Sequence, residues 1–229
     1  MPDAQTRQQP RQRTRQQPRQ TPRALRRDAT ENRATILEAA AAALNRDIEA
    51  SLTAIAEEAG LSRRAIYGHF ATRDELVTAV LLQGAERVGA SLNPIDHPDA
   101  RVEIALYGST LWAEVAHVRV MAQLAVRGPH RAQVAAALAP ARARLHDTVV
   151  RGVAAGVLRD DIAPATLARL IEGSALAVLD EANRTRISRA RGHELVMLAT
   201  LSTAGMGWRE ADRLIASTPE LAFSKEATA

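Results

Sequence analysis

Three side chains that recognise nucleic acids lie within five consecutive residues: Arg63, Arg64 and Tyr67. An arginine guanidinium can donate two hydrogen bonds to N7 and O6 of a guanine, so arginines on an exposed helix can read the major groove. Other groups that can reach phosphates lie beside them: Ser62, His69 and Arg73. Arg73 also falls in the first turn of the next expected helix, where free backbone N–H groups attract anions. This segment therefore indicates a surface that binds double-stranded DNA.

Other chemistries find less support in the residue types. The chain has no cysteine, which excludes disulfides, thiolate metal sites and cysteine nucleophiles. It has no nucleophile-elbow, phosphate-loop or dinucleotide-binding pattern. Glu114 and His117 have the Glu-x-x-His spacing of helical di-iron sites, but such sites need a second pair on another helix. We therefore expect no metal, no cofactor and no enzymatic activity.

The elements that must position the basic residues are two short helices joined by a tight turn. Ser51 is a good N-cap for the first helix and Ser62 for the second. Gly60 lies between them, where a tight turn needs a residue that tolerates positive φ. Two short helices around a glycine turn are typical of a helix-turn-helix unit, whose second helix enters the DNA groove. A purely structural helical hairpin is the alternative interpretation.

The resemblance to a known family is specific here. Residues around the turn resemble the DNA-binding domain of the tetracycline-repressor (TetR) family, and they are Ile55-Ala56, Ala59-Gly60-Leu61-Ser62, Ile66-Tyr67, His69-Phe70, Arg73 and Glu75-Leu76. Residues 36–40 are similar to the first helix of that domain, and residues 152–170 resemble a later helix junction more loosely. The strong match covers about residues 30–80, and its combination of motifs argues against the hairpin interpretation.

The resemblance implies an all-α protein with two parts. In this family the first three helices bind DNA, the fourth links the two parts, and the remaining helices form a ligand pocket and a dimerising pair. By position, the implied DNA-contacting residues are Ser51, Thr53, Ser62, Arg63, Arg64, Tyr67, His69 and Arg73. Arg73 stands where the family usually has a phosphate-binding lysine. Gly68 departs from the pattern because a bulkier polar residue is usual there.

Helical periodicity continues through the rest of the chain, and no segment alternates like a strand. Further helices are expected at about residues 72–92, 98–117, 118–126, 140–155, 164–182, 190–203 and 208–216. The helices at 164–182 and near 190–204 are apolar enough to build a four-helix interface between two copies, so we expect a homodimer and a pseudo-palindromic operator.

Three residues are candidates for contact with a small effector: Tyr107, Trp112 and Met121. Such residues can line a pocket, but they also fill cores, and the resemblance rather than the pattern favours a pocket. Apolar inward stripes indicate a largely apolar ligand between the helices at 98–117, 140–155 and 164–182, near Trp112.

The N-terminus has a different composition. Residues 1–27 contain eight arginines against Asp3 as their one acidic residue, although the whole chain has a formal net charge of only +4. This Arg/Gln/Pro-rich segment cannot bury a core, so we expect a disordered arm. It is either a solvated tail or a basic arm that contacts DNA phosphates.

The sequence thus predicts three parts: the arm at 1–27, a DNA-binding domain at 28–75 and a ligand-binding and dimerisation domain at 76–229. No stretch is long and apolar enough to span a membrane, and no signal peptide is recognisable, so a cytoplasmic protein is expected. The favoured function is a repressor that a small apolar ligand releases from DNA. The alternative is an architectural or DNA-coating protein that binds DNA without a ligand.

Overall fold

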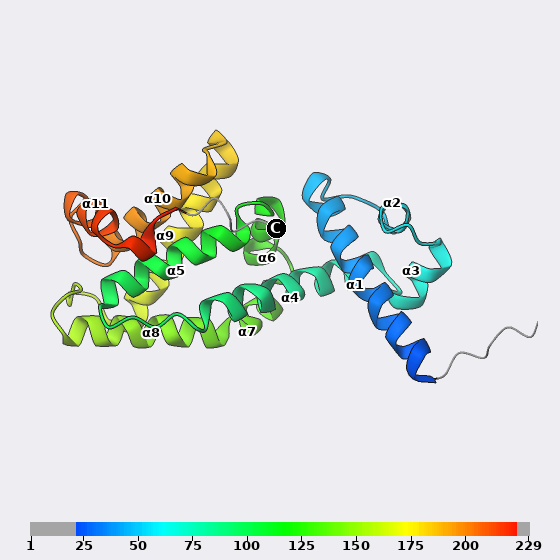
Figure 1. The fold of residues 1–229 in the computed structure, drawn as a ribbon, viewed down its shortest axis with the longest axis horizontal. Coiled ribbons are helices and arrows are strands. Elements are labelled where there is room, and N and C mark those ends of the chain that lie inside the picture. The colour runs from blue at the N-terminus through cyan, green and yellow to red at the C-terminus, as the bar shows by residue number, and fades with distance from the viewer. Residues whose placement is uncertain (1–21, 224–229) are drawn as a thin grey trace, which may run out of the picture.

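The computed structural model describes residues 22–223, with the backbone alone described at 22–30 and at 119. All regular elements in this part of the chain are helices, which confirms the all-α prediction. A smaller N-terminal lobe contains α1 (Pro22–Arg46), α2 (Leu52–Glu58) and α3 (Arg63–His69). The long helix α4 (Arg73–Leu92) runs from this lobe into the larger one (Figure 1).

The larger lobe is built from the remaining helices. They are α5 (Ala100–Val115), α6 (Arg119–Arg127), α7 (Arg131–Ala137), α8 (Ala139–Ala154), α9 (Pro164–Thr185), α10 (Arg189–Thr203), α11 (Trp208–Ser217) and the 3-10 turn η1 (Pro219–Leu221). The helices α5, α9 and α10 pack together at its centre, and α8 packs against α5 and α9. None of the described helices is long and apolar enough to cross a membrane.

The N-terminal lobe has a core of its own. Its fully buried side chains come from α1 to α4 and are Ile36, Leu44, Ile55, Ile66, Phe70 and Leu76. Two residues of the larger lobe, Met121 on α6 and Val134 on α7, complete this core and are buried with it. Because buried apolar side chains pack as densely as a crystal, a shift of α6 or α7 must be felt by the N-terminal lobe.

The second core fills the larger lobe and includes Ile104, Val149, Leu167, Ile171, Met197 and Leu201. Helix α4 contributes to both cores: Leu76, Val80 and Leu81 lie in the first, while Val88 and Leu92 lie in the second. The predicted domain boundary at residues 75 and 76 thus falls inside one continuous helix. The division into two domains stays a proposal.

Two helices differ from the sequence prediction: α1 begins earlier, and α7 is an additional helix. The first helix begins at Pro22, six residues before Asp28, where the predicted DNA-binding domain begins, and proline is well tolerated in a first helical turn. The other residues of the predicted arm, 1–21, lie outside the described part of the chain. Helix α7 was not predicted, and it lies between the helices expected at 118–126 and 140–155. Leu138 separates α7 from α8, and Pro140 occupies the first turn of α8.

Candidate nucleic-acid interface and effector cavity

The turn between α2 and α3 has the backbone that its sequence predicts. The hydroxyl oxygen of Ser51 accepts a hydrogen bond from the Ala54 N–H, and that of Ser62 accepts one from the Ala65 N–H, each at 3.2 Å. Gly60 has a φ of +65°, a conformation that costs L-residues about 1–2 kcal/mol. The two caps and the glycine fix the angle at which α3 leaves α2.

The inward faces of both helices hold the unit on the rest of the lobe. Ile55 and Ala56 of α2 and Ile66 of α3 are buried in the N-terminal core, together with Phe70 just after α3. The guanidinium of Arg33 on α1 lies 5.1 Å from the centre of the Phe70 ring, in a cation–π arrangement. The opposite face of α3 is left open to solvent.

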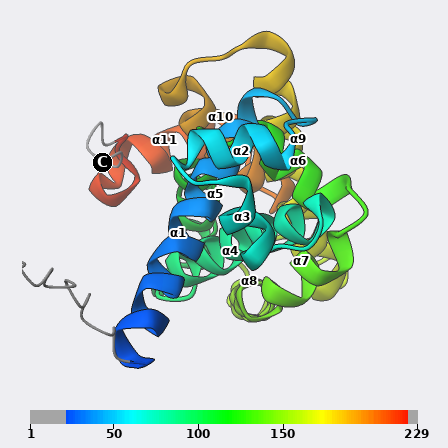
Figure 2. The ribbon, with the colours of Figure 1, turned by 90° about the vertical axis from the view of Figure 1, so that its right-hand side faces the viewer.

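Three of the eight predicted DNA-contacting residues lie on that open face. Arg63, Arg64 and Tyr67 are exposed, and 54% of Tyr67 is accessible. Figure 2 looks onto this end of the molecule, where α2 and α3 face the viewer. Gly68 also lies there, and a Cβ added to it would meet no atom within 4 Å, so the missing side chain leaves open space.

The other predicted contacts are less free. Ser51 and Ser62 are exposed, but their hydroxyl oxygens already cap α2 and α3. Thr53 and His69 are half-buried at the edge of the exposed face. Their roles at DNA stay predictions.

Arg73 is turned into the protein. Its Nε donates to the carbonyl oxygen of Ala50 at 2.9 Å, and its Nη2 donates to that of Ile48. The side chain therefore joins the start of α4 to the loop between α1 and α2. A phosphate contact of this guanidinium, predicted by position, competes with these two bonds, and it stays a prediction.

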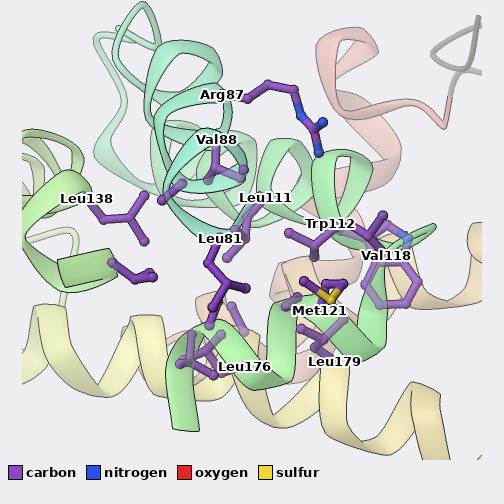
Figure 3. Close-up of a pocket in the computed structure, with 18 of the residues that line it drawn as sticks. Leu81, Arg87, Val88, Leu111, Trp112, Val118, Met121, Leu138, Leu176 and Leu179 are labelled. Atoms are coloured by element: carbon purple, nitrogen blue, oxygen red, sulfur yellow. The ribbon is translucent and has the colours of Figure 1, made fainter. Parts of the chain in front are cut away.

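The larger lobe contains an apolar cavity of about 140 Å³. Its walls come mainly from α4, α5, α6 and α9, and Figure 3 shows Leu81, Leu111 and Met121 around it. The polar side chains in its lining are Gln83, Arg87 and Glu172. Glu172 is paired with Arg142, whose Nη2 lies 2.7 Å from Oε1.

Trp112 and Met121 both line this cavity, and its position differs from the expected one. The expected site lay between the helices at 98–117, 140–155 and 164–182, whereas here α4 and α6 replace the middle one. The sequence did not reveal this, because periodicity shows which face of a helix is apolar but not which helix it meets.

Tyr107 lies in a second, smaller hollow of about 70 Å³ between α5, α8 and α9. This hollow matches the expected trio of helices. The residues that it shares with the larger cavity are Val88, Leu111, Leu138, Glu172 and Ala175. The Tyr107 hydroxyl is buried beside the Arg144 side chain and makes no hydrogen bond of ordinary geometry. Its burial raises the pKa of Tyr107 above the ordinary value.

The Trp112 side chain is fixed on two sides. Its indole Nε1–H donates to the carbonyl oxygen of Arg189 at 2.9 Å, at the start of α10. On the same helix, a Cβ added to Gly192 would overlap the six-membered ring of Trp112. The glycine therefore makes the room in which the indole lies.

Glu114 and His117 do not form a metal site. The Glu114 carboxylate accepts hydrogen bonds from Arg87 Nε at 3.0 Å and from Ser91 Oγ at 2.8 Å, so it ties α5 to α4. Within residues whose side chains are described, no three His, Asp or Glu side chains gather as metal ligands would. Glu114 is thus a linking residue rather than a polar group of the cavity.

Comparisons with known proteins agree with this geometry. Residues 36–80 match the family model described as bacterial regulatory proteins, tetR family. No curated protein matches the chain as a relative. Many solved structures share the fold, and all three cited below are less than 25% identical to this chain.

Three of these structures illustrate the similarity. A putative TetR-family transcriptional regulator from Rhodococcus sp. has a TM-score of 0.63 at 20% identity over 76% of this chain and 98% of its own. The fatty acid degradation regulator FadR from Bacillus halodurans has 0.66 at 15%, over 76% and 95%. FadR from Bacillus subtilis, solved with stearoyl-CoA, has 0.61 at 17%, over 74% and 98%.

Proposed function

We propose that this chain, whose residues 36–80 form a TetR-family DNA-binding domain on a TetR-like fold, is a repressor that a small effector releases from DNA. The observation that carries the DNA-binding part is the open face of α3, where Arg63, Arg64 and Tyr67 project from a helix fixed by its own core. Arg63 and Arg64 are proposed to read bases, and Tyr67 and His69 to contact phosphates.

The effector is proposed to be a largely apolar small molecule in the cavity beside Trp112 and Met121. The cavity has mostly apolar walls with a few polar groups at its edge, which is the usual composition of a small-molecule site. A protein of similar fold, FadR from Bacillus subtilis, was solved with an acyl thioester, stearoyl-CoA. That likeness supports an effector in general and does not name this one.

Release is proposed to act through the shared walls of the cavity and the N-terminal core. Leu81, Met121 and Val134 belong to that core and also line the cavity. A molecule that enlarges the cavity must therefore displace side chains on which α1 to α4 are packed. Release further requires that the effector bind the displaced arrangement more tightly, since equal affinity for both arrangements shifts nothing.

The functional unit is proposed to be a homodimer that binds a pseudo-palindromic operator in the cytoplasm. Helix α9 leaves Leu170 47% exposed, and a second copy that packs against this helix would cover it. Two recognition helices must then be spaced by one turn of DNA, about 34–36 Å. Light scattering at micromolar concentration tests this, and a monomer would contradict it.

The experiment for DNA binding compares exposed arginines on the two lobes. A duplex selected from random sequences is titrated with wild type, Arg63→Ala, Arg64→Ala and the control Arg213→Ala on α11. We expect each α3 variant to lose about 1–3 kcal/mol of binding free energy and to relax base preference at one position. The control should bind as wild type does. Normal binding by both α3 variants would show that α3 does not read bases.

The alternative function, a ligand-independent architectural protein, is favoured by the arginines of residues 1–27. A footprint of one or two palindromes supports the repressor, and continuous coverage supports the alternative. Deleting residues 2–20, which lie before the described part of the chain, tests the arm separately. The measured quantity is the slope of the logarithm of the DNA-binding constant against the logarithm of the salt concentration. If the arm neutralises phosphates, this slope should become less steep by about 0.9 for each phosphate that the shortened chain leaves unneutralised.

A further inference from the structure

A third hollow lies at the junction of the two lobes, apart from the effector cavity and the hollow at Tyr107. This crevice of about 420 Å³ is formed by the end of α1, the connection from α5 to α6 and the end of α9. Its lining consists of Asn45, Ala116, His117, Val120, Ala182, Asn183 and Arg186. None of these residues lines the effector cavity. The crevice is therefore a site separate from the effector cavity.

Two buried polar atoms at this crevice lack hydrogen-bond partners: Oδ1 of Asn45 and Nδ2 of Asn183. The orientation of the Asn45 amide is fixed, because its Nδ2 donates to the carbonyl oxygen of His117 at 3.0 Å. Oδ1 must then be an unused acceptor. Leaving a buried polar atom unpaired is unfavourable, so a molecule that satisfies both atoms is favoured there.

The charge of the crevice favours an anion. Arg186 lies in the lining, and none of the lining side chains that the structure describes is a carboxylate. Partial burial, and next the nearby cations Arg87 and Arg189, lower the pKa of His117, which keeps its imidazole neutral at pH 7. Among the lining side chains that the structure describes, the guanidinium of Arg186 is the charged group that a ligand meets.

The backbone holds Arg186 at this place. Arg186 ends α9 in the left-handed conformation, with φ +52° and ψ +39°. It is the non-glycine residue with positive φ in the described part of the chain. A left-handed residue is a common way to end a helix, and here it sets where the Arg186 side chain leaves α9.

We propose that the junction crevice binds a short carboxylate that carries a hydrogen-bond donor next to the carboxylate, such as a small hydroxy acid. The carboxylate accepts from Arg186 and Asn183 Nδ2, and the neighbouring hydroxyl donates to Asn45 Oδ1. The short aliphatic remainder contacts Val120 and Ala116. Because Asn45 belongs to α1 and the other groups to the larger lobe, the bound molecule links the two lobes.

The binding test uses three probes of similar size on the full chain without DNA. Lactate has both groups, propionate lacks the donor, and lactamide lacks the charge. We expect lactate to bind about tenfold more tightly than either of the others, which is the effect of about 1.4 kcal/mol for one hydrogen bond or charge. In NMR spectra, lactate should shift the side-chain amide signals of Asn45 and Asn183.

Two variants locate the site. Arg186→Gly removes the guanidinium, and because glycine accepts the left-handed conformation, it should leave thermal stability equal or higher. Lactate affinity should fall at least tenfold in this variant. Arg184→Ala removes an exposed charge from the same end of α9, outside the crevice, and should bind lactate normally.

Several outcomes overturn the proposal. If the three probes bind equally, the crevice does not distinguish their groups, and lactate is an adventitious additive only. If none of them binds up to high millimolar concentration, the crevice holds only solvent. Unchanged affinity in Arg186→Gly places the molecule elsewhere. None of these measurements involves DNA, so their failure leaves the proposed DNA-binding function untouched.

Discussion

The imidazole of His130 joins the two lobes, with Nε2 3.1 Å from Oδ1 of Asp74. On the other side of the ring, Nδ1 lies 3.1 Å from Oγ1 of Thr78. His130 is buried in the turn between α6 and α7, whereas Asp74 and Thr78 lie in the first turns of α4. An ionised carboxylate only accepts hydrogen bonds, so Nε2 carries a proton. His130 thus links the turn between α6 and α7, two helices that line the effector cavity, to α4, the helix that follows α3.

The two partners of this link should differ in their effect on stability. His130→Ala removes a buried side chain with two polar contacts, so the free energy of unfolding should fall by about 1–3 kcal/mol. Asp74→Asn changes a carboxylate that is 78% exposed, and such pairs are worth less than about 1 kcal/mol. Urea unfolding measures both. Asp147→Asn, on a carboxylate that is 77% exposed beside His146, is the matched control. A larger loss for Asp74→Asn than for His130→Ala would contradict the assignment.

Arg73 should contribute mainly to the stability of the folded protein. Arg73→Ala removes charge-assisted hydrogen bonds to the carbonyl oxygens of Ala50 and Ile48, so unfolding should become easier by about 1.5–3 kcal/mol even without DNA. Thermal unfolding of the free protein measures this. Arg64→Ala, on the exposed face of α3, should change the melting temperature little. If Arg73→Ala lowers DNA affinity and leaves the melting temperature unchanged, the phosphate role predicted from sequence is the correct one.

Gly192→Ala should destabilise the protein, although alanine favours a helix over glycine by about 1 kcal/mol. The added Cβ overlaps the Trp112 ring, and such overpacking costs about 1–3 kcal/mol. In a Trp208→Phe background, which removes the other, exposed tryptophan, the emission of Trp112 should shift to longer wavelength. Gly84→Ala on α4 meets no atom within 4 Å and should be stabilising. Equal stability of both variants would show that Trp112 has free space.

Stability should fall as the solution becomes mildly acidic. Burial lowers the pKa of His193, and burial together with Arg87 and Arg189 lowers that of His117, both from an ordinary value of 6.5. The unfolded chain therefore binds protons at a higher pH than the folded chain does. Their contribution is complete above pH 6.5 and is lost as the pH falls toward the lower folded pKa values.

The melting temperature at pH 7.5 and pH 5.5 checks this dependence. His193→Gln should show a smaller drop between the two pH values than wild type, because it has no proton to take up there. Arg191→Gln, on the same helix, leaves the histidines in place and should keep the full drop. An identical drop in wild type and His193→Gln would show that His193 is not involved.

The sequence by itself determined the local structure that DNA binding requires. The two serine caps and Gly60 act within a few residues of chain, so their pattern alone predicts the angle between α2 and α3. The apolar period likewise predicts which side of α3 is buried at Ile66 and which side leaves Arg63 and Tyr67 exposed. The helical class and most helix positions followed for the same reason.

Only the tertiary structure decided which distant groups meet. Arg73 is drawn to the carbonyl oxygens of residues more than twenty positions earlier, and His130 lies against α4 across more than fifty. Helices α4 and α6 line the cavity, and Asn45 lies with Asn183 and Arg186 in the lining of the crevice. Periodicity fixes the face that a helix buries, but the partner on that face depends on how whole helices pack, and a single sequence does not encode this in neighbouring residues.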